Sequence, residues 1–232
     1  MKKLSLFLAP LLGWICISCG THSEKEISIF AASSLIKVLP VLLETYETKA
    51  DVDINIVYGG SNHLAAQIND GAPIDLFLTA DVESLNSNIS KVTDFVLASN
   101  YIVLATPMGS KENISGVMDL SRTDLSIAIC AQEVPCGKAA EDLGVSIIAD
   151  TYEPSVRSVM SRLTLGEVDL GVVYATDVIS EPRVVSIWPD SPQCPCVNYH
   201  GIALTSKGKD ISHHLAGEAA QTILSEYGFL TP

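Results

Sequence analysis

The sequence predicts an α/β fold with mostly parallel sheets, and three observations support this. Short runs of β-branched and apolar residues alternate along the chain with segments of helical periodicity. The 232 residues, 47% of them hydrophobic, are enough to bury the core of one large domain or two smaller ones. Several turns that lead from a strand into a helix are rich in serine, threonine and glycine.

The first third of the chain predicts a β-α-β-α-β unit. Strands are expected in EISIFAA, from Ile27 to Ala31, and in VDINIVY and PIDLFLTA. Helices are expected in SLIKVLPVLLETYETK and in SNHLAAQINDG, which begins at Ser61. Pro40 disrupts the first of these helices unless it lies in the first turn or at a kink. Such a run predicts parallel strands joined by right-handed crossovers.

A second α/β unit is expected to follow Pro107. The segment that leads to it, FVLASNYIVLATP, is interpreted as two β-rich pieces. Further strands are expected in DLSIAICA, VDLGVVYA, RVVSIWP and CVNYHGIALTS. Helices are expected in PCGKAAEDLG, in EPSVRSVMSRLTLGE, whose first turn suits Pro154, and in one terminal helix, ISHHLAGEAAQTILSEYGFL.

Residues 1–18 are typical of an export signal. Lys2 and Lys3 precede an apolar run that is short for a membrane span. The segment CISCG resembles a lipoprotein processing box, which would make Cys19 the acylated first residue of the mature protein. Cys16 departs from the leucine usual in such a box, and an ordinary cleaved signal is the alternative. We therefore expect an exported protein, at the cell surface or in the periplasm, with a lipid anchor on the outer face of the cytoplasmic membrane.

The acidic composition argues against a nucleic-acid partner. The formal net charge is -13, and no basic stripe interrupts the acidity. Residues 1–18 carry two lysines and no acidic residue, so their removal would make the charge -15. No later segment is predicted to span a bilayer, so a lipid anchor is the only membrane contact expected.

The cysteines favour disulfides because an exported chain meets an oxidising environment. Cys130 and Cys136 bracket the short loop CAQEVPC, where a local disulfide is expected. Cys194 and Cys196 are too close for a relaxed bridge with each other and would be strained, free or paired elsewhere. A zinc site is a weak alternative because no histidine has suitable spacing, and no site for a bare metal ion is expected.

Three turns rich in small residues indicate where a ligand would bind: AASSL, YGGSNH and LTADVESL. Parallel sheets place such turns at the carboxyl ends of their strands. Helix N-termini there point backbone N–H groups outward and favour anions, and serine hydroxyls add donors without bulk. For Ser34 and Ser61, however, the commoner role of a serine at a helix start is N-capping.

Four blocks, in their order and spacing, resemble the periplasmic molybdate-binding proteins (ModA family) of ABC transporters: FAASSL, GGSNHLAAQINDGAPIDLFLTAD, VPCGKAAEDLG and PSVRSVMSRLTLGEVDLGVVYATD. The likeness covers nearly the whole mature chain. It implies a two-lobe periplasmic-binding-protein fold of type II, with an oxyanion held between the lobes. Residues 26–104 plus 201–232 would form the first lobe and residues 105–200 the second. The hinge would lie near VLATP and NYHGI.

The resemblance also implies which residues hold the oxyanion. Ser34 and Ser61 would each give a hydroxyl and an amide. Ala80 and Val156 would give backbone N–H groups, and Tyr174 would give its phenolic O–H. The function implied is capture of molybdate, and of tungstate because it nearly matches molybdate in size, for delivery to an ABC permease with its ATPase. The protein would be a monomer without enzyme activity or cofactor.

A cage that contains only donors fits this ligand. Molybdate is fully deprotonated near neutral pH, whereas phosphate keeps a proton that needs an acceptor. Sulfate or another tetrahedral oxyanion is the alternative, since only cavity size would exclude sulfate. Gly60 departs from the hydroxyl residue often found before the second serine of the family, which would loosen that loop.

A serine acyl enzyme is a remote alternative. Ser34 and Lys37 match the Ser-x-x-Lys motif of penicillin-recognising enzymes, but SKGK at residues 206–209 matches it equally well. The companion Ser-Asp-Asn and Lys-Thr-Gly motifs are absent, and GGSNH lacks the second glycine of a nucleophile elbow. No enzyme activity is therefore expected.

Overall fold

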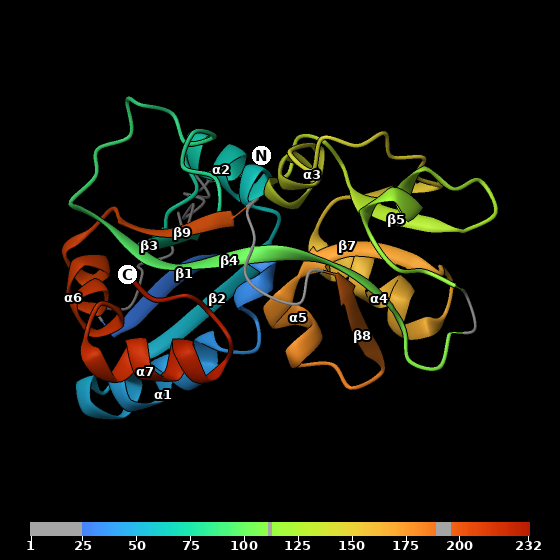
Figure 1. Cartoon of the computed structure of the whole chain (residues 1–232). Helices are drawn as coiled ribbons and strands as arrows, with labels where there is room; N and C mark the ends of the chain where they lie inside the picture. The colour runs from blue at the N-terminus through green and yellow to red at the C-terminus, as the bar shows by residue number, and fades with distance from the viewer. Residues whose placement is uncertain (1–24, 111–112, 189–195) are drawn as a thin grey trace, which may run out of the picture.

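Two lobes lie side by side in the computed structural model, which describes residues 25–110, 113–188 and 196–232 (Figure 1). The long strand β4 (Thr93–Pro107) extends through both lobes, and β9 (Cys196–Ala203) pairs with its first part in the first lobe. A continuous path of paired strands, in the order β2-β1-β3-β9-β4-β7-β5-β6, joins both lobes, and β8 pairs with β4 beside this path.

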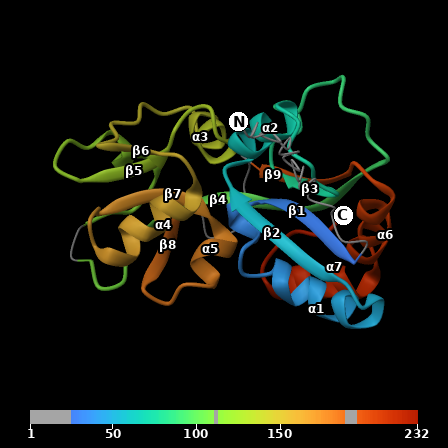
Figure 2. The same cartoon turned by 180° about the vertical axis from the view of Figure 1, so that it is seen from behind.

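The first lobe contains the predicted β-α-β-α-β unit. Strand β1 (Glu26–Ala32) pairs in parallel with β2 (Asp53–Gly59) and with β3 (Leu76–Thr79). Strand β9 then adds antiparallel to β3 and to the first part of β4. The carboxyl ends of β1, β2 and β3 therefore meet at the edge of the sheet that faces the second lobe (Figure 2).

Helices cover both faces of this sheet. One apolar core packs on α1, α6 and α7, and another packs on α2. The bounds are α1 (Leu39–Ala50), α2 (Ser61–Asn69), α6 (Ser206–Leu215) and α7 (Glu218–Glu226).

Two helix predictions in this lobe need correction. The segment after β1 first forms a short 3-10 turn, η1 (Ser33–Leu35), and α1 starts only afterwards, so that Pro40 lies in its first turn. Proline is tolerated there because the N–H it lacks would have no partner in the helix. The predicted single terminal helix is two helices, because the chain leaves the helical conformation at Gly217 (φ -73°, ψ 156°), the N-cap of α7.

The second lobe is built on the rest of β4, to which β7 and β8 add antiparallel, while β5 pairs in parallel with β6 and β7. Its elements are η2 (Val117–Ser121), β5 (Ile127–Cys130), α3 (Pro135–Glu141), β6 (Thr151–Glu153), α4 (Val156–Leu165), β7 (Leu170–Tyr174), α5 (Ala175–Ile179) and β8 (Val184–Trp188). The short β6 and α5 had no counterpart among the predicted elements.

Helix α4 begins at Val156, two residues after Pro154. Pro154 was expected in its first turn but precedes the N-cap, which is Ser155. The Ser155 hydroxyl oxygen accepts a hydrogen bond from the N–H of Ser158 at 3.3 Å. A capping hydroxyl fixes the helix start here, and the proline ends the extended segment before it.

Strand β4 is one 15-residue strand, not the two pieces predicted from the sequence. Its pairing with β9 has an irregular register between Val96 and Ala98, where the strand can bend. Ala98 packs in the first lobe's core and Ile102 in the second lobe's core. Strand β4 thus passes from the first lobe's core to the second lobe's core a few residues before the predicted hinge segment VLATP.

The predicted α/β fold with helices flanking the sheets is confirmed. A disulfide joins Cys130 and Cys136, whose Cα atoms are 5.6 Å apart. Cys196 is exposed at the start of β9, whereas Cys194, the signal segment and the lipidation candidate Cys19 lie outside the described residues. Within the described part of the chain, no helix is long and apolar enough to cross a membrane.

Candidate functional site

A small cavity of about 20 Å³ lies between the two lobes. All five residues predicted to hold the oxyanion line it. Ser34, Ser61 and Ala80 come from the first lobe, and Val156 and Tyr174 come from the second. The structure thus brings together residues that are up to 140 positions apart in the sequence.

Starts of helices surround this cavity. Ser61 opens α2, Pro135 and Cys136 open α3, and Val156 opens α4, while Ser34 lies in the 3-10 turn η1. The first turn of a helix leaves N–H groups without partners in the helix, and the helix dipole makes that end positive. None of the described residues that line the cavity is charged. This environment favours an anion held by neutral donors.

The Ser34 hydroxyl has a buried partner. Its oxygen lies 2.7 Å from the hydroxyl oxygen of Tyr199 on β9, and both side chains are buried. Burial raises the pKa of the Tyr199 phenol, so the phenol is protonated at neutral pH. If Tyr199 donates in this pair, the hydrogen of the Ser34 hydroxyl is available to the cavity.

The Ser61 hydroxyl accepts a hydrogen bond from the backbone N–H of Ala80 at 3.0 Å. Ala80 therefore lines the cavity as predicted, but in this structure its amide donates to a neighbouring serine. Because this bond occupies a lone pair of the Ser61 oxygen, the hydroxyl hydrogen points elsewhere. Ser61 lines the cavity, and its hydroxyl donates to no acceptor among the described residues, so this hydrogen can serve a ligand there.

Tyr174 ends β7 and is 2% exposed. Burial raises the pKa of its phenol well above the ordinary value, so the side chain stays a neutral donor. Its backbone N–H donates to the carboxylate of Asp177 at 3.3 Å. Burial also raises the pKa of Asp177, to about 7. Among the described residues, no hydrogen bond engages the Tyr174 hydroxyl.

The backbone N–H of Cys136 is a donor that was not predicted from the sequence. This residue follows Pro135 in the first turn of α3 and lines the cavity. Proline has no N–H, so Cys136 supplies the first amide hydrogen of that helix. The signal was present in VPCG, since a proline often occupies the first position of a helix. The disulfide to Cys130 fixes this helix start to β5.

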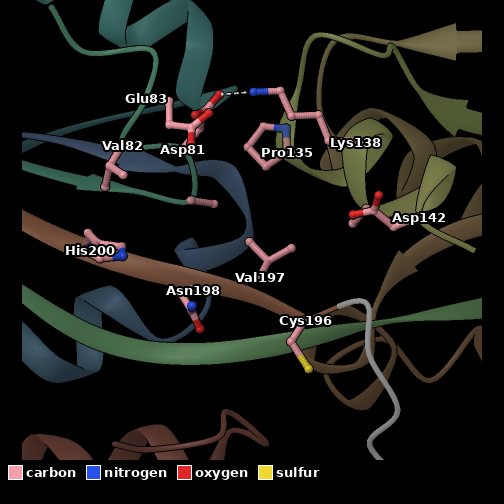
Figure 3. Close-up of a pocket in the computed structure, with 12 residues that line it drawn as sticks. Asp81, Val82, Glu83, Pro135, Lys138, Asp142, Cys196, Val197, Asn198 and His200 are labelled. Carbon is pink, nitrogen blue, oxygen red and sulfur yellow. Dashed lines mark hydrogen bonds and ion pairs between the residues drawn. The ribbon is translucent and has the colours of Figure 1, made fainter.

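An ion pair joins the two lobes in a second pocket, drawn in Figure 3, which shares Ala80 and Pro135 with the cavity. The Lys138 ammonium on α3 lies 2.8 Å from the carboxylate of Asp81, which follows β3. The Ser84 hydroxyl donates to the same carboxylate oxygen at 2.7 Å. Burial opposes ionisation of Asp81, but the hydrogen bonds from Lys138 and Ser84 outweigh it and lower the pKa of Asp81.

The serine acyl enzyme arrangement is not formed. Lys37 is exposed and lines a separate pocket, whereas Ser34 is buried and paired with Tyr199. No hydrogen bond joins Ser34 and Lys37 in the part of the chain that the structure describes. A base is therefore missing where the motif requires one.

A family model described as bacterial extracellular solute-binding protein matches residues 27–230. The chain belongs to this family. The resemblance to molybdate-binding proteins inferred from sequence blocks is also confirmed, because molybdate-binding proteins are among the relatives of this solute-binding protein.

Three known proteins are similar to it along most of their length. The molybdate-binding protein ModA of Mycobacterium tuberculosis is 27% identical, with 91% of this chain and 87% of the relative covered. The ModA of Escherichia coli is 26% identical, with 98% of each covered. The structure of the periplasmic molybdate-binding protein of Azotobacter vinelandii matches with a TM-score of 0.72 at 21% identity, covering 89% of this chain and 99% of that one. This last match shows a shared periplasmic-binding-protein fold.

Proposed function

We propose that this solute-binding protein captures molybdate, and tungstate as well, between its two lobes and delivers it to an ABC permease. The observation that carries the proposal is the buried cavity between the lobes, lined by helix starts and hydroxyls and by no charged side chain among the described residues. The named relatives of Mycobacterium tuberculosis and Escherichia coli are molybdate-binding proteins, which supports the choice of ligand.

The proposed contacts come from both lobes. Ser34 and Ser61 donate hydroxyl hydrogens, with Ala80 orienting Ser61 through its amide. Val156 and Cys136 donate backbone N–H groups, and Tyr174 donates its phenolic O–H. Because only the closed arrangement supplies all of these donors to one small ligand, binding favours closure. The permease would recognise the closed form.

The donor-only lining separates molybdate from phosphate. Molybdate, tungstate and sulfate are fully deprotonated near neutral pH and accept hydrogen bonds at every oxygen. Phosphate keeps a proton, and that proton would face a donor without an acceptor, which costs free energy in a buried site. Sulfate is the second candidate, and the larger size of molybdate is what must distinguish them.

Titration calorimetry and thermal unfolding with molybdate, tungstate, sulfate and phosphate test the proposal. A ligand at a hundred times its Kd stabilises the folded state by about 2.7 kcal/mol. We expect such stabilisation by molybdate and tungstate, a much weaker effect of sulfate, and none from phosphate at the same concentration. Stabilisation by sulfate alone would overturn the molybdate assignment.

The protein would act as an exported monomer without a cofactor or enzyme activity, with molybdate as its cargo. Acylation of Cys19 would hold it on the outer face of the cytoplasmic membrane. The cysteine in CISCG supports this anchor. Replacement of Cys19 by serine should release the protein from the membrane fraction, and unchanged membrane association would contradict the anchor.

A further inference from the structure

Gly60 makes an unusually close contact between the lobes. A Cβ atom built on Gly60 would lie 2.7 Å from the backbone carbonyl oxygen of Pro154. Gly60 belongs to the first lobe, immediately before α2, and Pro154 belongs to the second, two residues before α4. A separation below 3.0 Å is one that real Cβ atoms essentially never show, and a backbone oxygen cannot rotate away.

The backbone of Gly60 does not itself require glycine. Its dihedral angles, φ -64° and ψ 135°, lie in the extended region that any residue adopts. Within its own lobe, an added Cβ would come within 3.1 Å only of the ends of the Asn62 and His63 side chains, which can turn away. The contact with Pro154 is therefore the shortest of the three, and it is the one that side-chain rotation cannot relieve.

This contact lies directly beside the proposed donors. Ser61 follows Gly60, and Val156 follows Pro154 by two residues. Gly60, Ser61 and Val156 line the small cavity, as does Ser155, which Pro154 directly precedes. Since the cavity measures about 20 Å³, the donors on its two sides are already close together, and a small outward shift of one lobe would remove one side from the ligand.

We propose that Gly60 is a positioning residue that lets the two lobes approach until donors from both sides reach one tetrahedral oxyanion. This inference rests on the proposed function and extends it to a residue that makes no side-chain contact with the ligand. A methyl group at position 60 raises the free energy of the closed arrangement. It leaves each lobe able to fold.

The test compares Gly60→Ala with a matched control, Gly217→Ala. Gly217 is also a helix N-cap in an extended conformation (φ -73°, ψ 156°), but an added Cβ would approach only the carbonyl oxygens of His213 and His214, in its own lobe. Intrinsic capping effects are therefore similar in the two variants. Measurements are the unfolding temperature without ligand, the Kd and dissociation rate for molybdate, and the change in radius of gyration on adding molybdate.

We expect unfolding temperatures without ligand that differ little between the two variants. Gly60→Ala should bind molybdate at least tenfold more weakly, mainly through faster dissociation, and should contract less on binding. Gly217→Ala should behave as the wild type.

Two results would overturn the inference while leaving the proposed function intact. One is wild-type affinity in Gly60→Ala. The other is a much lower unfolding temperature, or failure to fold, in Gly60→Ala alone, because the clash would then lie within a lobe. If the wild type bound no oxyanion in calorimetry, the proposed function would fail first and the inference with it.

Discussion

The Ser34–Tyr199 pair shows how a residue behind the site can set a donor's direction. The two hydroxyl oxygens are 2.7 Å apart, and Tyr199 is fully buried on β9 in the core of the first lobe. A phenol that donates to Ser34 leaves the serine hydrogen for the anion. Tyr199 therefore acts through Ser34 and does not contact the ligand in the proposed mode.

Replacing Tyr199 by phenylalanine should weaken molybdate binding by about 1 kcal/mol, or about fivefold, because one neutral hydrogen bond orients the donor. Calorimetry measures the change. Tyr58→Phe is the matched control, since the Tyr58 hydroxyl is buried with no partner among the described residues. An equal loss of affinity in both variants would contradict the positioning role of Tyr199.

Asp177 should make the stability of the folded protein depend on pH. Burial raises its pKa from 3.8 to about 7, so the folded state holds this proton more tightly than the unfolded chain does. The contribution of Asp177 to stability therefore falls as the pH rises from about 4 to about 7. Each pKa unit corresponds to about 1.4 kcal/mol.

Asp177→Asn should remove this penalty, because an amide is neutral and its oxygen can still accept the N–H of Tyr174. We expect the free energy of unfolding of the variant to exceed that of the wild type by about 2 kcal/mol at pH 8. This is less than the whole pKa shift would give at about 1.4 kcal/mol per unit, because the Asp177 side chain is only partly shielded from water. The gain should shrink as the pH falls and vanish near pH 3, below the unfolded-state pKa of 3.8. Denaturant unfolding without ligand checks this, and a difference that does not change with pH would refute it.

At the scale of elements, the sequence was most informative where local signals are strong. The β-branched runs before YGGSNH and LTAD predicted β2 and β3, and small residues at strand ends predicted the position of Ser34 and Ser61. The sequence was least informative where contacts with distant parts of the chain determine how far an element extends. Nothing local indicates that β4 continues through Ser99 and Asn100 as one strand, because that depends on pairing with β9 and β7.

The site could be predicted only in part for the same reason. A hydroxyl is visible in the sequence, but a backbone donor depends on where a helix begins and which way its first turn faces. Cys136 was therefore missed, and the engagement of the Ala80 amide by Ser61 could not be foreseen. Gly60, interpreted from sequence as a loosening of its loop, packs against Pro154 of the other lobe.

Helix α3 connects the cavity to the ion pair between the lobes. Cys136 in its first turn lines the cavity, and Lys138 reaches Asp81 of the first lobe at 2.8 Å. The Asp81 side chain is 5% exposed and that of Lys138 49% exposed. The pair is therefore worth more than a surface salt bridge, but solvent around the lysine reduces its strength.

Lys138→Met should weaken molybdate binding by about 1 kcal/mol, because the closed arrangement would leave the Asp81 carboxylate without its cation. Lys91→Met is the control: Lys91 pairs with Asp94 at 3.2 Å within the first lobe, at comparable lysine exposure. Calorimetry of both variants at low and high salt makes the comparison. Equal affinities for Lys138→Met and the wild type would show that this ion pair does not support closure.

At the scale of the whole molecule, distant negative charges repel the anionic ligand, whereas a few cations near the cavity attract it. The distance of each charge from the cavity decides which effect is larger. The chain carries a formal net charge of -13, yet it is proposed to capture a dianion. Lys37, Arg157 and Arg183 line a pocket next to the cavity and would attract the ligand, but Asp177 and Glu181 share that pocket. In water, one charge about 20 Å away contributes about 0.2 kcal/mol per unit ligand charge, so thirteen contribute about 5 kcal/mol for a dianion before screening.

A nearby cation about 10 Å away contributes only about 0.8 kcal/mol for the same dianion, so net repulsion should dominate the approach of the ligand. Salt shortens the Debye length from about 30 Å at 0.01 M to about 10 Å at 0.1 M and screens the distant charges most. The association rate for molybdate should therefore rise between these NaCl concentrations, about twofold or more. Stopped-flow measurement of tryptophan fluorescence follows it. A rate that falls with salt would instead mean that the cations beside the cavity govern capture.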